Sequence, residues 1–296
     1  MQDFPEGVRV EKGRGALERL VISADQGEAE IHFHGAQVTH FQPKGERPVL
    51  WMSSKSRFEG GAPGKPIRGG VPICFPWFGP KLGTPSAPAH GVARILAWQM
   101  GAVVREADGS VRATFELAAD GYTRTLFPDA FVVTFSVTVA RTLKMDLTVH
   151  NPGPFAMTFE AALHSYFAVG DVRQVAITGL EGAPFIDQAD RDAQKSGVAA
   201  PISIAGQVDR AYVGTSATVT ILDPVWERRI VIRKSGSATT VVWNPWIDKA
   251  KAMPDFGDDE WQKMICVETA NAFENAVTLD AGASHVMSAT IEAQPS

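Results

Sequence analysis

The sequence predicts an all-β protein, a large antiparallel β-sandwich, from three observations. Apolar and polar residues alternate with a period of two in several runs, and no stretch has the longer period of an amphipathic helix. The runs follow one another closely with glycine, proline, asparagine or aspartate between them, as at Asp108-Gly109. No strand–helix–strand alternation is present, which argues against a parallel nucleotide-binding sheet. Half-buried antiparallel sheets account for all three observations.

The clearest strand covers residues 111–117, where apolar and polar residues alternate strictly. Residues 131–139 and 143–149 follow, with apolar side chains on one face and mainly threonine, serine and charged side chains on the other. Similar runs predict strands near Ile31, Val219, Ile230, Val241 and Ile291.

Length and composition indicate a globular protein with a sizeable core, because 45% of the 296 residues are hydrophobic. We expect a single domain over residues 1–296, in which the tail after about residue 271 has no specific assignment. The net charge of −5 is spread over interspersed acidic and basic residues. No basic stripe of a nucleic-acid-binding protein is present, and no apolar run approaches the roughly 20 residues that span a bilayer.

The two cysteines, Cys74 and Cys266, lie in apolar contexts and fit no metal-ligand spacing. The first residues lack the basic and apolar segments of a secretory signal. We therefore expect a reduced, cytoplasmic protein with no metal and no cofactor. A disulfide between the cysteines stays possible without support from their spacing. The sequence does not predict the oligomeric state, and a monomer is compatible with it.

Residues 53–90 depart from the strand pattern because they are dense in glycine and proline. Proline stiffens the backbone and glycine lets it approach a ligand closely, so this stretch suits the wall of a binding site. A mobile surface loop is the other interpretation. Five apolar residues argue against it, because a loose segment would leave them in water: Val71, Ile73, Phe75, Trp77 and Phe78.

A histidine and a glutamate each interrupt an apolar strand-like run: His164 in Ala-Ala-Leu-His-Ser-Tyr-Phe and Glu268 in Met-Ile-Cys-Val-Glu-Thr-Ala-Asn. Alternation places His164 on the face of Tyr166 and Glu268 on the face of Cys266. A titratable group in such a run needs a partner or a cleft. The pattern alone leaves two interpretations open, namely polar residues bonded to backbone, or an acid and a base that move protons.

Several longer blocks carry a family resemblance. Residues 68–80 read Arg-Gly-Gly-Val-Pro-Ile-Cys-Phe-Pro-Trp-Phe-Gly-Pro and residues 88–94 read Pro-Ala-His-Gly-Val-Ala-Arg. Later blocks are Leu-His-Ser-Tyr-Phe-Ala-Val-Gly-Asp (163–171), Asp-Arg-Ala-Tyr (209–212), Val-Trp-Asn-Pro (242–245) and Cys-Val-Glu-Thr-Ala (266–270). In this order the blocks resemble the glucose-6-phosphate 1-epimerases, or hexose-6-phosphate mutarotases, a branch of the aldose 1-epimerase superfamily. One departure is Val92, where relatives usually carry phenylalanine.

The resemblance implies a galactose mutarotase-like supersandwich whose concave sheet face holds the sugar. It also implies that Glu268 is the general base and His164 the general acid of a cofactor-independent isomerase. Such an enzyme interconverts the α and β anomers of a hexose 6-phosphate, with glucose 6-phosphate as the implied substrate. The chemistry agrees, since a base that removes the C1 hydroxyl proton and an acid that protonates the ring oxygen open the ring without redox chemistry.

Five further residues are candidates for substrate binding. Arg68 and Arg94 flank the two loop blocks, and a guanidinium can clamp two phosphate oxygens. Lys65 and Lys81 could add to this patch or be solvated surface charges. We expect His90 to hold a hydroxyl or the charge near the ring oxygen, or else to be a turn residue packed against Trp98. The resemblance assigns Asp209 to sugar hydroxyls, and Trp77 could stack on a sugar face.

Two other functions stay open. One is an aldose 1-epimerase that acts on unphosphorylated sugars, and the other is a sugar-phosphate-binding protein without turnover. A glycoside hydrolase is a weaker candidate, because no second carboxylate has a strong claim. The pair His32 and His34 could face one way on a strand, but without a third ligand nearby we expect exposed strand histidines rather than a metal site.

Overall fold

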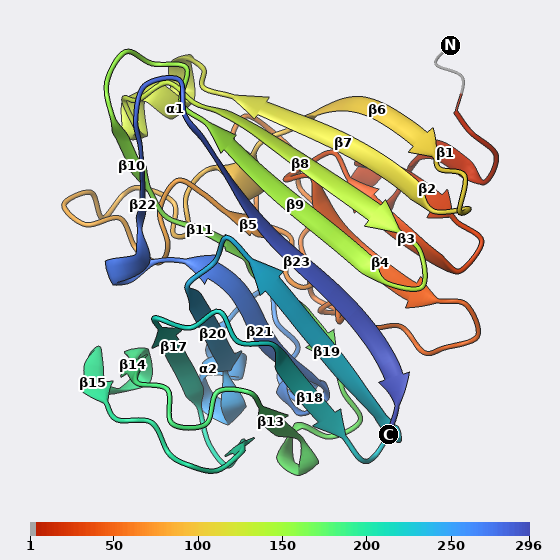
Figure 1. Ribbon diagram of the computed structural model, residues 1–296, viewed down its shortest axis with the longest axis vertical. Coiled ribbons are helices and arrows are strands. Elements are labelled where there is room, and N and C mark those ends of the chain that lie inside the picture. The colour runs from red at the N-terminus through yellow and green to blue at the C-terminus, as the bar shows by residue number, and fades with distance from the viewer. Residues whose placement is uncertain (1–3) are drawn as a thin grey trace.

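A computed structural model describes residues 4–296 and confirms the predicted all-β class, with two large antiparallel sheets (Figure 1). The larger sheet has nine strands. In spatial order they are β16 (Ile202–Ser203), β13 (Ala176–Thr178), β18 (Val219–Asp223), β19 (Arg228–Ser235), β23 (Ser284–Pro295), β9 (Leu143–His150), β8 (Val132–Val139), β7 (Val111–Ala118) and β6 (Gln99–Arg105).

The second large sheet has eight strands. They are β15 (Ala193–Lys195), β14 (Phe185–Asp187), β17 (Val208–Val213), β20 (Thr239–Asn244), β21 (Met264–Asn271), β11 (Ala161–Leu163) and β5 (Ile73–Cys74), with β12 (Tyr166–Ala168) also paired to β21. A four-stranded sheet contains β1 (Val8–Lys12), β2 (Glu18–Ser23), β3 (Gly27–His32) and β4 (Gln37–Pro43), and a two-stranded sheet pairs β10 (Met157–Phe159) with β22 (Val277–Leu279).

Helices are short, as the absence of a helical period predicts. The α-helices of the described chain are α1 (Gly121–Leu126) and α2 (Trp246–Ala252). Helix α1 begins at a capping box, in which the Asp120 carboxylate accepts the backbone N–H of Thr123. Single 3-10 turns are η1 (Arg14–Ala16), η2 (Ala93–Ile95), η3 (Val172–Gln174), η4 (Gln188–Asp190), η5 (Glu260–Lys263) and η6 (Phe273–Asn275).

The C-terminal tail is the longest strand of the nine-stranded sheet. Strand β23 lies between β19 and β9, so it joins strands from two distant parts of the chain (Figure 1). The alternating run near Ile291 predicts this strand, and Met287, Ala289 and Ile291 are buried along it. The tail after residue 271, which sequence analysis leaves without an assignment, therefore holds together the two halves of the larger sheet.

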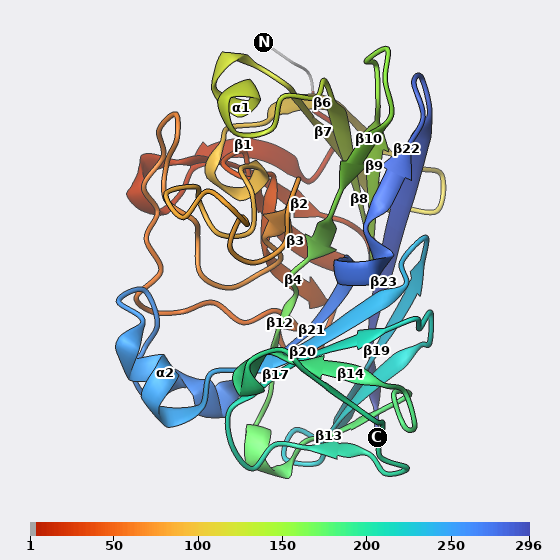
Figure 2. The same cartoon turned by 90° about the vertical axis from the view of Figure 1, so that its left-hand side faces the viewer.

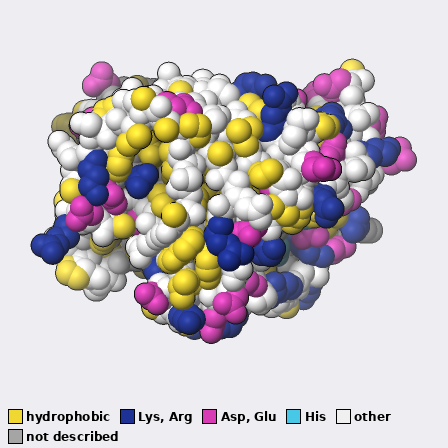
Figure 3. All heavy atoms as spheres, turned by 90° about the horizontal axis from the view of Figure 1, so that it is seen from below, with side chains coloured by type: hydrophobic (Ala, Val, Ile, Leu, Met, Phe, Trp, Pro, Cys, Tyr) yellow, Lys and Arg dark blue, Asp and Glu magenta, His cyan; other side chains and the backbone are white. Residues whose placement is uncertain are grey.

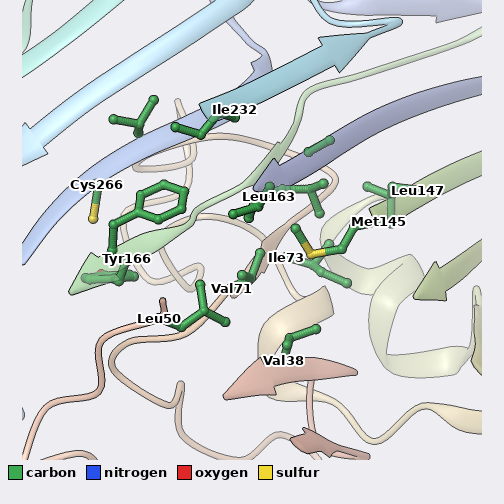
Figure 4. Packing of buried hydrophobic residues seen from close by; sticks show 14 of the residues in the cluster. Val38, Leu50, Val71, Ile73, Met145, Leu147, Leu163, Tyr166, Ile232 and Cys266 are labelled. Carbon is green, nitrogen blue, oxygen red and sulfur yellow. The ribbon is translucent and has the colours of Figure 1, made fainter. Parts of the chain in front are cut away.

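The core lies between the sheets. In β8 the burial alternates residue by residue, so that Val133, Phe135 and Val137 are fully buried. Figure 4 shows Met145 of β9 close to Ile73 of the eight-stranded sheet. The apolar residues that alternate along the sequence are thus the residues that join the two sheets.

The outer face of the eight-stranded sheet, away from the nine-stranded sheet, is covered by irregular segments. Figure 2 shows α2 and the loops of residues 51–98 on that side. Within residues 53–90 the only regular strand is the two-residue β5, yet the apolar residues that sequence analysis singled out, including Phe75 and Trp77, are buried. Residues 67–79 of this stretch are therefore packed against the core, whereas most residues on either side of them are at least partly exposed.

Two sequence-based expectations concern the surface. Charged side chains of both signs are interspersed over the face seen in Figure 3. The expected exposure of His32 and His34 is wrong, because both are buried. A ring nitrogen of His32 lies 3.1 Å from Thr39 Oγ1, and one of His34 lies 2.8 Å from the carbonyl oxygen of Lys65. Within residues 4–296, neither α-helix has the length and apolar character to cross a membrane.

Candidate active site

A cavity of about 330 Å³ opens over the outer face of the eight-stranded sheet. It brings together residues from five distant parts of the sequence. Six of the seven predicted site residues line it: Arg68, His90, Arg94, His164, Asp209 and Glu268. The seventh, Trp77, lines a neighbouring cavity of about 600 Å³, which shares Phe78, Gly79, Pro80 and Gln188 with the first.

His164 and Glu268 meet because of a break in strand pairing. Strand β21 pairs with β11 up to Leu163 and again with β12 from Tyr166, so His164 lies at the interruption between them. The backbone N–H of His164 donates to the carbonyl of Pro72 instead. At this interruption Nε2 of His164 lies 3.3 Å from Oε1 of Glu268. Both side chains are almost completely buried beneath the cavity.

Burial moves the pKa values of this pair toward the neutral forms. Desolvation lowers the pKa of His164 to about 3, and the nearby charges of Arg94 and Arg68 add to this effect. Desolvation likewise raises the pKa of Glu268 well above its ordinary value; Asp209 adds to the rise, and the charge of Arg94 opposes it. The pair therefore holds a single exchangeable proton over a wide range around neutral pH.

Tyr166 connects this pair to Arg68. The Tyr166 ring stacks on the His164 imidazole at 4.8 Å between centroids and 12° between planes. The same residue accepts a hydrogen bond at its hydroxyl from Nη1 of Arg68, at 3.0 Å. Trp243 packs edge-on against both rings of the stack. Aromatic neighbours thus orient the imidazole, since its Nδ1 has no hydrogen-bond partner in the part of the chain that the structure describes.

His90 has a defined tautomer. The backbone N–H of Gly79 lies 3.2 Å from Nδ1 of His90 and donates to it, so this nitrogen is an acceptor and the ring proton is on Nε2. Burial lowers the pKa of His90 well below its ordinary value, and the charges of Arg94 and His164 act in the same direction. Its ring packs against Phe78 and His164 rather than against Trp98. His90 is therefore a neutral N–H donor beside the cavity.

The two predicted arginines have unlike surroundings. Arg68 forms an ion pair with Asp255, with Nη2 at 3.1 Å from Oδ2. Burial opposes its charge, but Tyr166 and Asp255 outweigh this and raise its pKa. Arg94 donates from Nη2 to the carbonyl of Ala89 at 2.8 Å, and its Nε has no hydrogen-bond partner among the described residues.

Arg94 is only 8% exposed and has no carboxylate within ion-pair distance anywhere in residues 4–296. Burial accordingly lowers its pKa, although a guanidinium stays charged at every physiological pH. A buried cation without a counter-ion is costly, and a bound anion would remove that cost.

Asp209 lines the cavity from β17, which is separated from β21 by β20. Its Oδ1 accepts a hydrogen bond from Gln188 at 2.8 Å, and its Oδ2 accepts one from Lys249 at 3.2 Å. Burial raises the pKa of Asp209, and Lys249 opposes the rise. This group combines acceptors and donors of the kind that bind sugar hydroxyls.

Trp77, Lys65 and Lys81 do not line the cavity that holds the two arginines. Trp77 is buried, donates from Nε1 to the carbonyl of Pro88, and has Lys81 Nζ over its ring at 4.4 Å. Lys81 therefore belongs to the neighbouring cavity, and Lys65 is exposed and lines neither cavity.

Sequence analysis does not identify Lys249, Gln188 or Asp255 as site residues. Lys249 lies on α2 and Gln188 on η4, and no local pattern indicates that either reaches the cavity. Beneath the cavity, and not among the residues that line it, Cys266 lies two residues before Glu268 on the same face of β21. Its Sγ lies within 4.8 Å of a donor atom of His164 and one of Glu268.

Comparisons with known proteins show which family this chain belongs to. The sequence profile described as aldose 1-epimerase matches residues 18–292. A protein of Escherichia coli K12, named "putative glucose-6-phosphate 1-epimerase", is 36% identical over 259 residues, which cover 87% of this chain and 84% of the relative.

Solved structures agree with the sequence comparison. A crystal structure of a "putative mutarotase" from Salmonella typhimurium has a TM-score of 0.91 and 30% identity, over 100% of this chain and 96% of that chain. A galactose mutarotase-like protein from Clostridium acetobutylicum, 16% identical, has a TM-score of 0.73 over 98% of both chains and shares the fold. The match along most of its length, in sequence and in structure, shows that this chain is a member of the aldose 1-epimerase family with the galactose mutarotase-like fold.

Proposed function

We propose that this enzyme interconverts the α and β anomers of a hexose 6-phosphate, with glucose 6-phosphate as the foremost substrate. The observation that carries the proposal is the contact of 3.3 Å between His164 Nε2 and Glu268 Oε1 at the floor of an open cavity. A carboxyl group and an imidazole that share one proton are suited to moving protons between two oxygens of one substrate. The name of the Escherichia coli relative, "putative glucose-6-phosphate 1-epimerase", supports the choice of substrate.

Ring opening needs two proton transfers. Glu268, as the carboxylate, takes the proton of the C1 hydroxyl while His164, as imidazolium, gives a proton to the ring oxygen. The bond between C1 and the ring oxygen breaks, C1 becomes an aldehyde carbon and the ring oxygen becomes a hydroxyl. Rotation about C1–C2 and closure on the other face, with both transfers reversed, give the other anomer and restore the pair.

The phosphate would help to prepare His164 for this role. Desolvation together with the charges of Arg94 and Arg68 keeps the pKa of His164 low in the free protein. A phosphate dianion bound to these arginines would offset their charge and favour the imidazolium. The proton of the pair would then move from Glu268 to His164 when substrate binds, which creates base and acid in one step.

The other cavity residues would hold the sugar. His90 would donate its Nε2–H to a sugar oxygen near the reacting carbon, because Gly79 occupies its other nitrogen. Asp209, Lys249 and Gln188 would bind hydroxyls on the far side of the ring. Trp77 would contact only a substrate that extends into the neighbouring cavity. Arg94 would be the principal phosphate ligand and Arg68, already paired with Asp255, the second.

Exchange NMR on the anomeric protons of glucose 6-phosphate tests the proposal. Wild-type protein should accelerate exchange well above the unaided rate, and Glu268→Gln should return it to that rate. Glu292→Gln is the matched control, since Glu292 lies on β23 and pairs with Arg233 in the nine-stranded sheet. An exchange rate with folded wild-type protein that is no higher than the rate without protein would refute the proposed activity.

The same assay with glucose distinguishes the alternatives. If Arg94 binds phosphate, glucose should be turned over with a much higher KM than glucose 6-phosphate. Equal kcat/KM values for both sugars would make the protein an epimerase of unphosphorylated aldoses. Saturable binding of glucose 6-phosphate without faster exchange would identify a sugar-phosphate-binding protein.

A further inference from the structure

Three side chains of different chemistry meet below the cavity: a thiol, an imidazole and a carboxyl group. One donor atom each of His164, Cys266 and Glu268 lies within 4.8 Å of the other two. Cys266 and Glu268 are two residues apart on β21, so both point to the cavity face, and His164 reaches the same place from the β11–β12 interruption. The proposed epimerase chemistry uses the imidazole and the carboxyl group, whereas the thiol of Cys266 has no role in it.

The pair also carries polar atoms that the described chain does not satisfy. Nδ1 of His164 and Oε2 of Glu268 are buried and have no hydrogen-bond partner within residues 4–296. A buried polar atom without a partner costs about 1–3 kcal/mol, so an additional ligand at this position is favourable. The cavity that leads to both side chains gives such a ligand a path from solvent.

We propose that this cluster binds one thiophilic divalent cation, of the Zn²⁺ or Cd²⁺ class, as an inhibitor and not as a cofactor. Sulfur, imidazole nitrogen and carboxylate oxygen are the donors that zinc prefers, and three protein ligands leave the fourth position open toward the cavity. Ligand distances of about 2.0–2.3 Å place tetrahedral donors about 3.3–3.8 Å apart, so side-chain shifts of about 1 Å close the site.

Binding would stop catalysis for a simple reason. The ion would occupy lone pairs of both His164 and Glu268, and the Cys266 thiol and the Glu268 carboxyl group would each release a proton to solvent to become ligands. Neither proton carrier could then act on the sugar. Because this part of the inference rests on the proposed function, binding must also be measured without the reaction.

Cobalt spectroscopy measures binding directly. Co²⁺ added to wild-type protein should produce a near-ultraviolet charge-transfer band from a thiolate ligand, with one ion per chain, and Zn²⁺ should displace it. Cys266→Ser should lack the band. Cys74→Ser is the matched control, because Cys74 is the other free, buried cysteine, and it should keep the band. Wild-type protein without the band overturns the proposal, whatever its enzymatic activity.

Inhibition is measured in the exchange assay. Zn²⁺ should abolish wild-type acceleration at one ion per chain, and EDTA should restore it. Without metal Cys266→Ser should remain active, and it should need at least about tenfold more Zn²⁺ for half inhibition, because losing a ligand costs at least as much affinity as losing a second-shell group. Equal zinc sensitivity in Cys266→Ser and wild type would overturn the site. A protein that binds cobalt through Cys266 but never accelerates exchange would keep the metal site and refute the proposed function.

Discussion

Strands β8 and β21 are both eight residues long, yet they are buried in different ways. In β8 every second residue is fully buried and those between are half-buried, and every fully buried one is valine or phenylalanine. In β21 all eight residues are buried, and the face away from the nine-stranded sheet carries Cys266 and Glu268. A strand with one apolar face stabilises the sandwich. A strand that is buried on both faces, and that carries a carboxyl group on the face away from the other sheet, indicates a binding site over that face.

This difference indicates that the nine-stranded sheet mainly stabilises the fold, whereas the outer face of the eight-stranded sheet carries the site. The regular sheet buries apolar side chains and leaves its polar ones near solvent. The cavity face of the other sheet holds an uncompensated guanidinium and a carboxyl group whose pKa is well above its ordinary value. Groups of this kind oppose folding and are retained where a ligand or a reaction uses them. Substitutions on the two strands should therefore have opposite effects on stability and on activity.

Glu268→Gln on β21 should have the largest effect on activity. We expect kcat for glucose 6-phosphate to fall about 10³-fold, within the range for loss of a general base. Stability should rise at neutral pH, by about 1 kcal/mol, because the variant removes a carboxyl group that resists ionisation in the folded state. Exchange NMR and urea unfolding measure the two quantities.

The pH dependence of that stability gain provides the control. Because the folded pKa of Glu268 lies above the unfolded value, the wild type loses stability as pH rises from the unfolded value toward the folded one. The gain from Glu268→Gln should therefore be present at pH 7–8 and absent near pH 4. If Glu268→Gln is less stable than wild type at neutral pH, the conclusion that β8 serves stability and β21 serves the site is wrong.

Phe135→Ala on β8 should show the converse. Phe135 is fully buried in the nine-stranded sheet, so its truncation should cost about 3–5 kcal/mol of unfolding free energy. While the variant stays folded, its kcat should equal that of wild type, because β8 contributes no residue to the cavity. A large fall in kcat of Phe135→Ala, at a temperature where circular dichroism shows native structure, would mean that packing in the core affects the geometry of the site.

Two buried arginines extend the comparison to single side chains. Arg228 of β19 donates hydrogen bonds to the carbonyls of Pro48 and Ala168, whereas Arg94 has one carbonyl acceptor and faces the cavity. Arg94→Gln should raise KM for glucose 6-phosphate roughly 10- to 100-fold, since a hydrogen bond to a charged group contributes about 1.5–3 kcal/mol. KM for glucose should change little.

Arg228→Gln is the matched variant, with the same substitution at a buried site away from the cavity. It should lower stability and leave KM unchanged, while Arg94→Gln should leave the stability of the free enzyme unchanged or higher. Equal KM values for Arg94→Gln and wild type would assign the phosphate to other groups, with Arg68 and Lys249 as the next candidates.

The same contrast explains how much the sequence predicts. Alternation locates β7, β8 and β9 within one or two residues, because one face of each strand meets the core. It does not bring His164 and Glu268 together, since their contact depends on a break between β11 and β12 that leaves no periodic signal. The strand pattern singled out both residues, and the family resemblance supplied their roles as acid and base and the assignment of Asp209. Lys249 and Asp255 could not be predicted, because long-range packing of α2 and the turn after it decides where they lie.

The shape of the pH profile is the finest test of the buried pair. An exposed imidazole would titrate near pH 6.5, but desolvation places the pKa of His164 at about 3 and moves that of Glu268 well above 4.5. Between these limits the pair keeps its one proton, so kcat should follow a wide bell that is level around neutral pH. Because bound phosphate would raise the pKa of His164 in the complex, kcat should fall at acid pH, where the pair gains a second proton, and again at alkaline pH, where the pair loses its one proton. The profile should be taken from kcat rather than kcat/KM, because the substrate phosphate has its own ionisation near pH 6. A kcat controlled by one ionisation between pH 6 and 7 would show that His164 titrates independently of Glu268. The buried, coupled acid–base pair that distinguishes β21 from β8 would then not exist.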